Sequence, residues 1–470
     1  MHISQDELDA EIIASQVQLP CGIRVQNRLV KVAMYEHLAK LGSGPPNYRH
    51  LALYSTWAQG GWGMIITGNV QVAPDHLGLG ADLCIPRLGS QYDIAPWTQL
   101  AIASHACPSN EQPAVVIMQL CHVGRQSPRF IGGRWPWSRP LAPSARKVGD
   151  SLSEPFISKA LYWALFQEPK VMDETDIEMA IEQFVFGAKI ALEAGFDGVQ
   201  LHGSHGYLIT QFISPKTNQR TDAYSNPLHF LHRIVKRIRA IVPPTFILSV
   251  KLNAADYVEG GLTEDQSLEH IKEIAAWQMF DMIEISGGDY ENPGMRFSTI
   301  WIPSLDVAPL EFMASKRQAF FSQFARLANE AVSKPPKLLV SNSYKPPLIL
   351  LTGSLRGRSS IAAVLHNQHA SLIGLARPSV VLPDYPRYLM DSSCPSAHVP
   401  TPFEPTLPKL SISKLAGASV NTMWYCYEMG RLSHLGSSAY RPSKVPALWR
   451  VVHCYLTALF LWLLHWFRAI

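Results

Sequence analysis

Two histidines and a tyrosine, His202, His205 and Tyr207, lie within six residues of one another, directly after a short apolar run. Imidazole and phenol groups donate hydrogen bonds and move protons during reactions. The preceding residues 194–198 contain two glycines, a pattern typical of a helix C-cap followed by a turn into a strand. We therefore expect the three side chains where a parallel strand leaves its sheet, the edge at which α/β proteins carry out chemistry.

The spacing of His202 and His205 also fits two other interpretations. The pair could ligate a metal, as in a metal-dependent barrel hydrolase, or it could be structural and lie beside a turn. A metal site usually needs further carboxylate, thiolate or imidazole ligands, and residues 199–208 contain no carboxylate or cysteine. We therefore expect no metal here, and the hydrolase remains an alternative.

Eight short apolar runs predict the strands that must position these residues. Continuous runs of this kind are typical of parallel strands buried on both faces, and helical patterns lie between most of them. The clearest helical pattern, at 176–194, has one apolar face. A (β/α)8 TIM barrel fits this order; a doubly wound sheet would need an early GxGxxG turn, which the sequence lacks. The predicted strands are residues 29–34, 64–67, 115–120, 198–202, 247–252, 282–286, 348–352 and 372–376.

The ends of other predicted strands also carry functional groups. Gln119 offers an amide and Lys251 a cation, and together they suit a flat heterocycle with carbonyl and ring-nitrogen edges. Small residues lie at the ends of the last two strands, at Gly353 and Ala376, and suit a phosphate bound by backbone N–H groups. The proline-rich connection 121–172 is long enough to cross this face of the barrel, and we expect it to be a lid.

Composition narrows the classes of partner. The formal net charge is +4 over 470 residues, without a basic run interleaved with aromatics, so we expect no nucleic-acid partner. The seven cysteines are scattered, with no two closer than fourteen positions, which does not match zinc or iron–sulfur spacing. Reduced thiols in a cytosolic setting are expected.

Residues 451–467 form an almost wholly apolar segment, preceded by the basic residues Arg441, Lys444 and Arg450. Its length is at the lower limit for a membrane span, and it also contains two histidines. We predict a transmembrane or membrane-associated helix that acts as a tail anchor for a cytosolic catalytic domain. The alternative is a surface-packing or interfacial helix on a cytoplasmic protein. The predicted organisation is a barrel with a packed C-terminal helix at 19–435, a basic linker at 436–450 and the apolar helix at 451–467.

Several short motifs occur in one order between residues 19 and 435. They are 27–31 (Asn-Arg-Leu-Val-Lys), 119–126 (Gln-Leu-Cys-His-Val-Gly-Arg-Gln), 202–208 (His-Gly-Ser-His-Gly-Tyr-Leu), 211–215 (Gln-Phe-Ile-Ser-Pro) with Asn218, Arg220, Thr221 and Asp222, 251–253 (Lys-Leu-Asn) and 285–288 (Ile-Ser-Gly-Gly). In this combination the chain resembles the Old Yellow Enzyme family of FMN-dependent oxidoreductases. The resemblance implies that NADPH or NADH reduces FMN, which then reduces the activated C=C bond of an enone-type substrate.

The resemblance also implies roles for individual residues. His202 and His205 would bind the carbonyl oxygen of the substrate and stabilise the developing enolate, as an oxyanion hole does. Tyr207 would deliver the proton to the α-carbon. Gln119 and Lys251 would bind the pyrimidine edge of the flavin. The full set of expected cofactor-binding residues is Met34, Tyr35, Asn69, Gln119, Lys251, Gly353, Ser354, Ala376 and Arg377.

The sequence departs from the family pattern at several of these places. Tyr35 replaces a smaller residue, and Gly353-Ser354 and Ala376-Arg377 replace Gly-Gly and Gly-Arg at the phosphate end. The loop at 224–230 is shorter, and residues 338–347 look like an insertion. A flavin-binding scaffold with little turnover is therefore a second alternative. The oligomeric state stays open.

Overall fold

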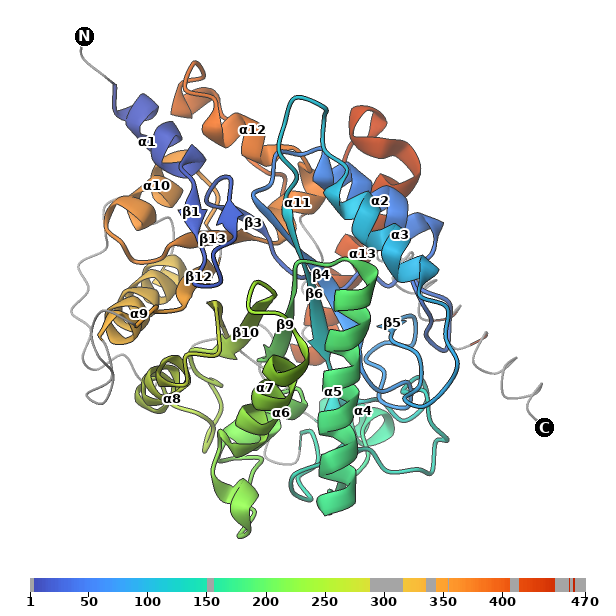
Figure 1. The fold of residues 1–470 in the computed structure, drawn as a ribbon. Coiled ribbons are helices and arrows are strands. Elements are labelled where there is room, and N and C mark those ends of the chain that lie inside the picture. The colour runs from blue at the N-terminus through green and yellow to red at the C-terminus, as the bar shows by residue number, and fades with distance from the viewer. Residues whose placement is uncertain are drawn as a thin grey trace.

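The computed structural model describes residues 4–149, 156–287, 316–334, 344–353, 355–405 and 414–443, together with positions 456 and 460. Eight parallel strands of this part form a closed barrel (Figure 1), because β3 pairs with both β4 and β13. The predicted barrel is confirmed, and the doubly wound sheet was the wrong alternative. The barrel strands are β3 (Leu29–Lys31), β4 (Met64–Gln71), β6 (Val115–Cys121), β9 (Gly198–Gly203), β10 (Ile247–Asn253), β11 (Met282–Ser286), β12 (Leu348–Thr352) and β13 (Leu372–Leu375).

The strand boundaries differ from the prediction mainly in β3, β4 and β13. β3 ends at Lys31 and β4 extends to Gln71, with a shift of register against β6 between Ile66 and Asn69. β13 ends at Leu375 because Ala376 (φ −93°, ψ −84°) already leads into the short helix that follows. Hydrophobic runs therefore located the strands, and backbone geometry at their ends set the limits.

Helices cover the outside of the barrel (Figure 1). The helix predicted at 176–194 begins slightly earlier, at Glu174, because Asp173 caps it by accepting a hydrogen bond from the backbone N–H of Asp176. It ends at Ala194, and its C-cap is Gly195, whose φ of 87° suits glycine. The covering helices are α2 (Tyr48–Ala58), α3 (Ala95–His105), α5 (Glu174–Ala194), α7 (His229–Ile241), α8 (Glu264–Ala276), α9 (Lys316–Ser333), α10 (Arg358–His366) and α13 (Lys414–Ala439).

Shorter elements fill the remaining connections. The 121–172 connection contains a parallel pair of two-residue strands, and its described residues form a folded excursion. These elements are α1 (Gln5–Ala14), β1 (Val17–Gln18), β2 (Arg24–Val25), β5 (Leu83–Cys84), η1 (Gly124–Gln126), β7 (Leu141–Ala142), α4 (Phe156–Leu165), β8 (Lys170–Val171), α6 (Leu208–Ile213), η2 (Ala223–Ser225), α11 (Arg377–Val381), α12 (Tyr385–Met390) and η4 (Ser396–His398).

The barrel interior changes character along its length. Inward side chains such as Val30, Met64, Ile117 and Leu350 form an apolar cluster at one end. Closer to the carboxyl ends of the strands, the inward side chains become polar. Gln119 on β6 and its pairing partner Gln200 on β9 are both fully buried in this layer. Buried polar groups require hydrogen-bond partners, so this layer must form a specific network.

The C-terminal predictions are only partly covered by the described residues. The packed C-terminal helix that we predicted at the end of the 19–435 unit corresponds to α13, which packs on α2 and α11. Gly436, with φ 66° and ψ 171°, interrupts that helix. Most of the 444–470 segment, and residues 338–343 of the predicted insertion, lie outside the described residues. Within the described part, no helix has the length and apolar character needed to cross a bilayer.

Candidate active site

His202, His205 and Tyr207 are neighbours in space at the carboxyl end of β9. The Nδ1 atom of His205 lies 3.3 Å from Nε2 of His202. The ring of Tyr207, the N-cap residue of α6, meets the His202 ring edge-on with 4.7 Å between centroids. His202 and Tyr207 are both buried. The end of β9 and the turn after it thus bring two imidazoles and one phenol into contact.

His202 is held in its neutral form. Burial lowers the pKa of its imidazole well below the usual range, and the nearby His205 and Lys251 act in the same direction. The backbone N–H of Ser204 donates to Nδ1 of His202 at 3.4 Å. An Nδ1 that accepts leaves the ring proton on Nε2, the nitrogen that faces His205. His202 is therefore a neutral hydrogen-bond donor at pH 7.

His205 adopts a backbone conformation with φ 59°, which is uncommon for a residue other than glycine. Its backbone N–H donates to Oδ1 of Asn253 at 3.1 Å, and its carbonyl accepts from Nε2 of Gln126 at 2.8 Å. Its side-chain Nε2 lies 3.0 Å from Oγ of Ser286. A hydroxyl both donates and accepts, so Ser286 is compatible with either tautomer of His205.

Gln119 and Lys251 lie on the two strands that flank β9. The strand register sets Gln119 opposite Gln200, and Lys251 opposite His202. Nε2 of Gln119 donates to Oε1 of Gln200 at 2.7 Å. Oε1 of Gln119 is buried and has no hydrogen-bond partner among the described residues. The amide therefore presents an unsatisfied acceptor.

Lys251 forms a buried ion pair inside the barrel. Its Nζ lies 2.9 Å from Oε1 of Glu284 on β11, and the two side chains are 5% and 0% exposed. The same carboxylate accepts from Oγ1 of Thr352 at 2.9 Å and from Nε2 of Gln200 at 3.0 Å. A continuous network of side chains thus crosses the barrel from β6 to β12.

Met34 and Tyr35 follow β3, and Asn69 lies in β4 beside Gln119 of β6. Asn69 is paired with Gln119 in the sheet, and both are buried. Met34 and Tyr35 are partly buried, and the carbonyl of Tyr35 accepts from Sγ of Cys426 on α13 at 3.0 Å. Asn69 therefore lies next to Gln119, and Met34 and Tyr35 lie in the segment that leads from β3 to α2.

The expected phosphate-binding residues lie in more open surroundings. Gly353 directly follows β12, and Ser354 lies outside the described residues. Ala376 has a negative φ, so alanine in place of glycine costs no left-handed strain there. The side chain of Arg377 is 36% exposed, and its Nη1 lies 3.9 Å from Oε1 of Glu404. Arg356 forms an ion pair with the same carboxylate.

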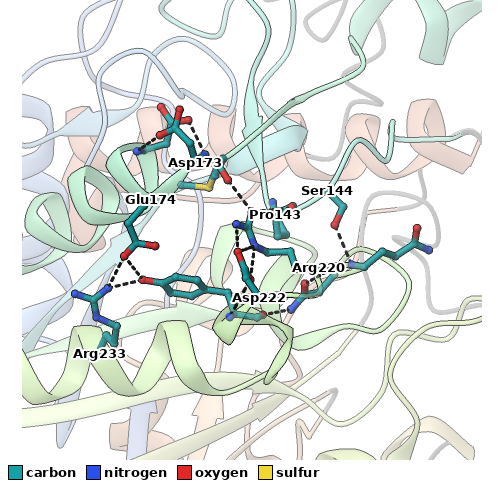
Figure 2. A network of polar contacts seen from close by, with 12 residues as sticks. Pro143, Ser144, Asp173, Glu174, Arg220, Asp222 and Arg233 are labelled. Atoms are coloured by element: carbon teal, nitrogen blue, oxygen red, sulfur yellow. Dashed lines mark hydrogen bonds and ion pairs between the residues drawn. The ribbon is translucent and has the colours of Figure 1, made fainter.

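Polar contacts fasten the 121–172 excursion to the loop between α6 and α7 (Figure 2). Arg220 donates to the backbone oxygens of Pro143 at 3.2 Å and Met172 at 2.7 Å. The backbone N–H of Gln219 donates to Oγ of Ser144 at 2.9 Å. Arg220 therefore anchors the middle and the C-terminal end of the segment that we expected to be a lid.

The N-terminal turn of α5 joins this network. The hydroxyl of Tyr224 lies 3.2 Å from Oε1 of Glu174, which also forms an ion pair with Arg233 at 3.4 Å (Figure 2). Asp222 accepts from Nε of Arg220 at 3.0 Å and from the backbone N–H of Tyr224 at 3.0 Å. The shortened loop at 224–230 is thus tied into the same contacts.

No three histidine, cysteine, aspartate or glutamate side chains are grouped as a metal site in the described part of the chain. His202 and His205 instead contact each other and Ser286. In the described part of the chain, the two histidines therefore lack the further ligand that a hydrolase metal site would need.

Sequence reasoning missed the residues that support the site. Gln200 and Glu284 were expected only as parts of strands, Thr352 only as a strand-end residue without a partner, and Asn253 only as part of a motif. The available signal was a polar residue inside an otherwise apolar strand, as in Val199-Gln200-Leu201 and Ile283-Glu284-Ile285. In a parallel barrel such a residue faces the interior at an alternate position and needs a partner there.

Comparison with known proteins agrees with this fold and site. Residues 21–296 match the NADH:flavin oxidoreductase / NADH oxidase family. The chain is 34% identical over 387 residues to the NADH-dependent flavin oxidoreductase iliE of Hypocrea jecorina (strain QM6a), covering 81% of this chain and 90% of that protein. It is 36% identical over 376 residues to the protein of the same name from Neonectria sp. (strain DH2), covering 79% of this chain but 46% of that longer protein.

A solved Old Yellow Enzyme homologue from Zymomonas mobilis has the same fold, with a TM-score of 0.60 and 20% identity over 81% of this chain and 93% of that one. The chain therefore belongs to the NADH:flavin oxidoreductase / NADH oxidase family, the FMN-dependent NAD(P)H oxidoreductases of the Old Yellow Enzyme type.

Proposed function

We propose that this chain reduces the C=C bond of an α,β-unsaturated carbonyl compound with hydride that NADH delivers through FMN. The observation that carries the proposal is the meeting of His202, His205 and Tyr207 at one strand end, beside the buried Gln119 and Lys251. Donors for a carbonyl oxygen, a proton donor and contacts for a flavin are thus adjacent.

The residues at the pyrimidine end fit FMN. Oε1 of Gln119 is a buried acceptor without a partner among the described residues, and Lys251 is a buried cation. An acceptor and a cation complement the N–H and carbonyl edge of a flavin and the negative charge of its reduced form. When bound, FMN supplies the hydride chemistry. Gly353, Ala376 and Arg377 would bind its phosphate.

His202 and His205 would hold the carbonyl oxygen of the substrate. Their facing nitrogens lie 3.3 Å apart, so one oxygen can come within hydrogen-bond distance of both. Nε2 of His202 carries a proton, which it donates to Nδ1 of His205 in this structure. When a substrate oxygen lies between the rings, donation from Ser286 to Nε2 of His205 would leave a proton on Nδ1 for the same oxygen. Two such donors stabilise negative charge that develops on the oxygen.

Tyr207 would supply the proton. Hydride adds to the β-carbon and the C=C π electrons shift toward the carbonyl, so the α-carbon must gain a proton to complete the reduction. The Tyr207 ring is buried and adjacent to His202. It is thus placed to donate while the two histidines hold the oxygen.

NADH is the donor we propose, because the two relatives described above carry the name NADH-dependent flavin oxidoreductase at 34% and 36% identity. Anaerobic reduction of the bound flavin by NADH and by NADPH, at equal concentrations, tests this choice. Faster bleaching with NADPH would contradict it.

The decisive experiment measures the two half-reactions separately by stopped-flow absorbance. We expect NADH to bleach the flavin equally fast in wild type and in Tyr207→Phe. Reoxidation by cyclohex-2-enone should be roughly 100-fold slower in the variant, the usual contribution of a general acid. Tyr92→Phe is the matched control, because Tyr92 contacts the distant Glu193 near the surface.

Other outcomes identify the alternatives. A colourless protein would rule out the proposed function. A yellow protein that NADH never bleaches would favour a flavin-binding scaffold. Equal reoxidation rates in wild type and Tyr207→Phe would remove the proton-donor role while leaving the flavin chemistry intact.

We also propose that the apolar segment 451–467 associates with a membrane. Leu456 and Phe460 are its two described positions, and their side chains are 58% and 60% exposed. Exposed apolar side chains favour a lipid surface. Full-length protein that stays in the carbonate-washed membrane pellet, while a chain ending at residue 443 is released, would support the proposal; release of both would contradict it.

A further inference from the structure

Glu284 is a fully buried carboxylate whose role in the site remains unassigned. It lies on β11 in register with Lys251 of β10 and faces the barrel interior. A buried charge is costly unless a partner and hydrogen bonds compensate it. Glu284 has three such contacts, from Lys251, Thr352 and Gln200. These donors come from the three strands β10, β12 and β9.

The contact with Gln200 fixes the direction of a chain of hydrogen bonds. An ionised carboxylate only accepts hydrogen bonds, so the NH2 group of Gln200 must face Glu284. The carbonyl oxygen of Gln200 must then face Gln119, and it accepts from the NH2 group of Gln119. That arrangement turns Oε1 of Gln119 away from Gln200, where it lacks a partner among the described residues.

We infer that Glu284 is a positioning residue that controls both flavin contacts at the pyrimidine end. Through Gln200 it makes Gln119 present an acceptor, which suits the N–H group of an oxidised flavin's pyrimidine ring. Through its ion pair it fixes Lys251 and offsets part of the positive charge. The inference rests on the proposed function, since it assumes that Gln119 and Lys251 contact FMN.

This arrangement has a measurable consequence for the bound flavin. Reduced flavin is more negative than oxidised flavin, so an uncompensated Lys251 favours the reduced form. Glu284→Gln removes the compensating charge and keeps the shape of the side chain. We expect the variant to bind reduced FMN more tightly relative to oxidised FMN by roughly tenfold, which raises the two-electron midpoint potential by about 30 mV.

The experiment measures the midpoint potential of the FMN-loaded protein by equilibration with a reference dye. The control is Glu428→Gln, because Glu428 is also a fully buried carboxylate but lies on α13, beside Arg431 and Tyr440. Its loss should change stability without moving the potential. A potential that rises equally in both variants would overturn the inference.

A second variant covers the case in which Glu284→Gln does not fold or retain FMN. Thr352→Val removes one neutral donor from the carboxylate and leaves its charge in place. The charge of Glu284 then acts more strongly on Lys251, so the potential should fall, by less than it rises in Glu284→Gln. An unchanged or raised potential would contradict the inference.

Failure of the inference is distinguishable from failure of the proposed function. Wild type that binds no FMN overturns both. Wild type that binds FMN and is bleached by NADH, while Glu284→Gln keeps the wild-type potential, overturns only the role of Glu284.

Discussion

Lys251 and Arg377 are the cations that we assign to the two ends of the proposed flavin site, and their surroundings differ. The Lys251–Glu284 pair lies inside the barrel, with side chains 5% and 0% exposed and 2.9 Å between the charged atoms. Arg377 and Glu404 are 36% and 55% exposed and lie 3.9 Å apart. The Lys251 end is a buried network, and the Arg377 end is a long, partly exposed ion pair.

The difference shows where substitution is tolerated. Buried hydrogen bonds hold Gln119 and Lys251 through Gln200 and Glu284, so a change in one displaces the others. The pyrimidine end also lies within residues 21–296, which match the family, whereas Gly353 and Arg377 lie beyond them. The departure from the family pattern at Ala376-Arg377 thus falls in a more exposed part of the molecule than Lys251 and Glu284.

The largest expected effect comes from removing the buried cation. Lys251→Met leaves Glu284 buried and unpaired, and we expect the free energy of unfolding to fall by about 3–5 kcal/mol. Arg377→Met removes an exposed cation from a long contact and should cost less than about 1 kcal/mol. Urea unfolding of the two FMN-free variants, followed by circular dichroism, measures both. Similar losses would remove the distinction between the ends.

The second-largest expected effect is a loss of stability in acid at the buried end of the site. Burial lowers the folded-state pKa of His202 below the ordinary imidazole value near 6.5. Above that value both states are neutral and the full stability is present. As the pH falls below it, the unfolded chain binds a proton that folded His202 does not, so stability falls by up to about 1.4 kcal/mol per pH unit.

The variant His202→Asn isolates this contribution. Between pH 7.5 and 5.5 the free energy of unfolding of this variant should fall less steeply than that of wild type. The difference between the two slopes should approach the contribution of one bound proton, about 1.4 kcal/mol per pH unit. His434→Asn is the control for replacing a histidine by asparagine, because His434 is exposed on α13. Parallel curves for wild type and His202→Asn would show that His202 titrates normally in the folded protein.

The sequence predicted the parts of this molecule that depend on local pattern. Continuous apolar runs located all eight strands. Polar residues at the strand ends predicted a site at His202, Lys251 and Gln119, which lie on the adjacent strands β9, β10 and β6. The sequence did not reveal that Glu284 bridges Lys251 and Gln200, because this contact depends on the register in which β9, β10 and β11 pair, and that pairing joins segments far apart in the sequence. It also could not show that Glu404, almost thirty residues beyond β13, returns to Arg377.

The smallest expected effect concerns this last contact. Glu404 neutralises Arg356 and Arg377, so a phosphate at this end must compete with its carboxylate. Glu404→Gln should therefore tighten FMN binding, by about twofold to fivefold, because exposed ion pairs contribute up to roughly 1 kcal/mol. The gain should shrink at high salt, which screens exposed charges.

Glu111→Gln, which breaks a similarly exposed pair with Arg387, is the matched control. If both variants bind FMN like wild type in a fluorescence titration, the exposed arginines do not bind the phosphate, and the phosphate end depends on backbone donors.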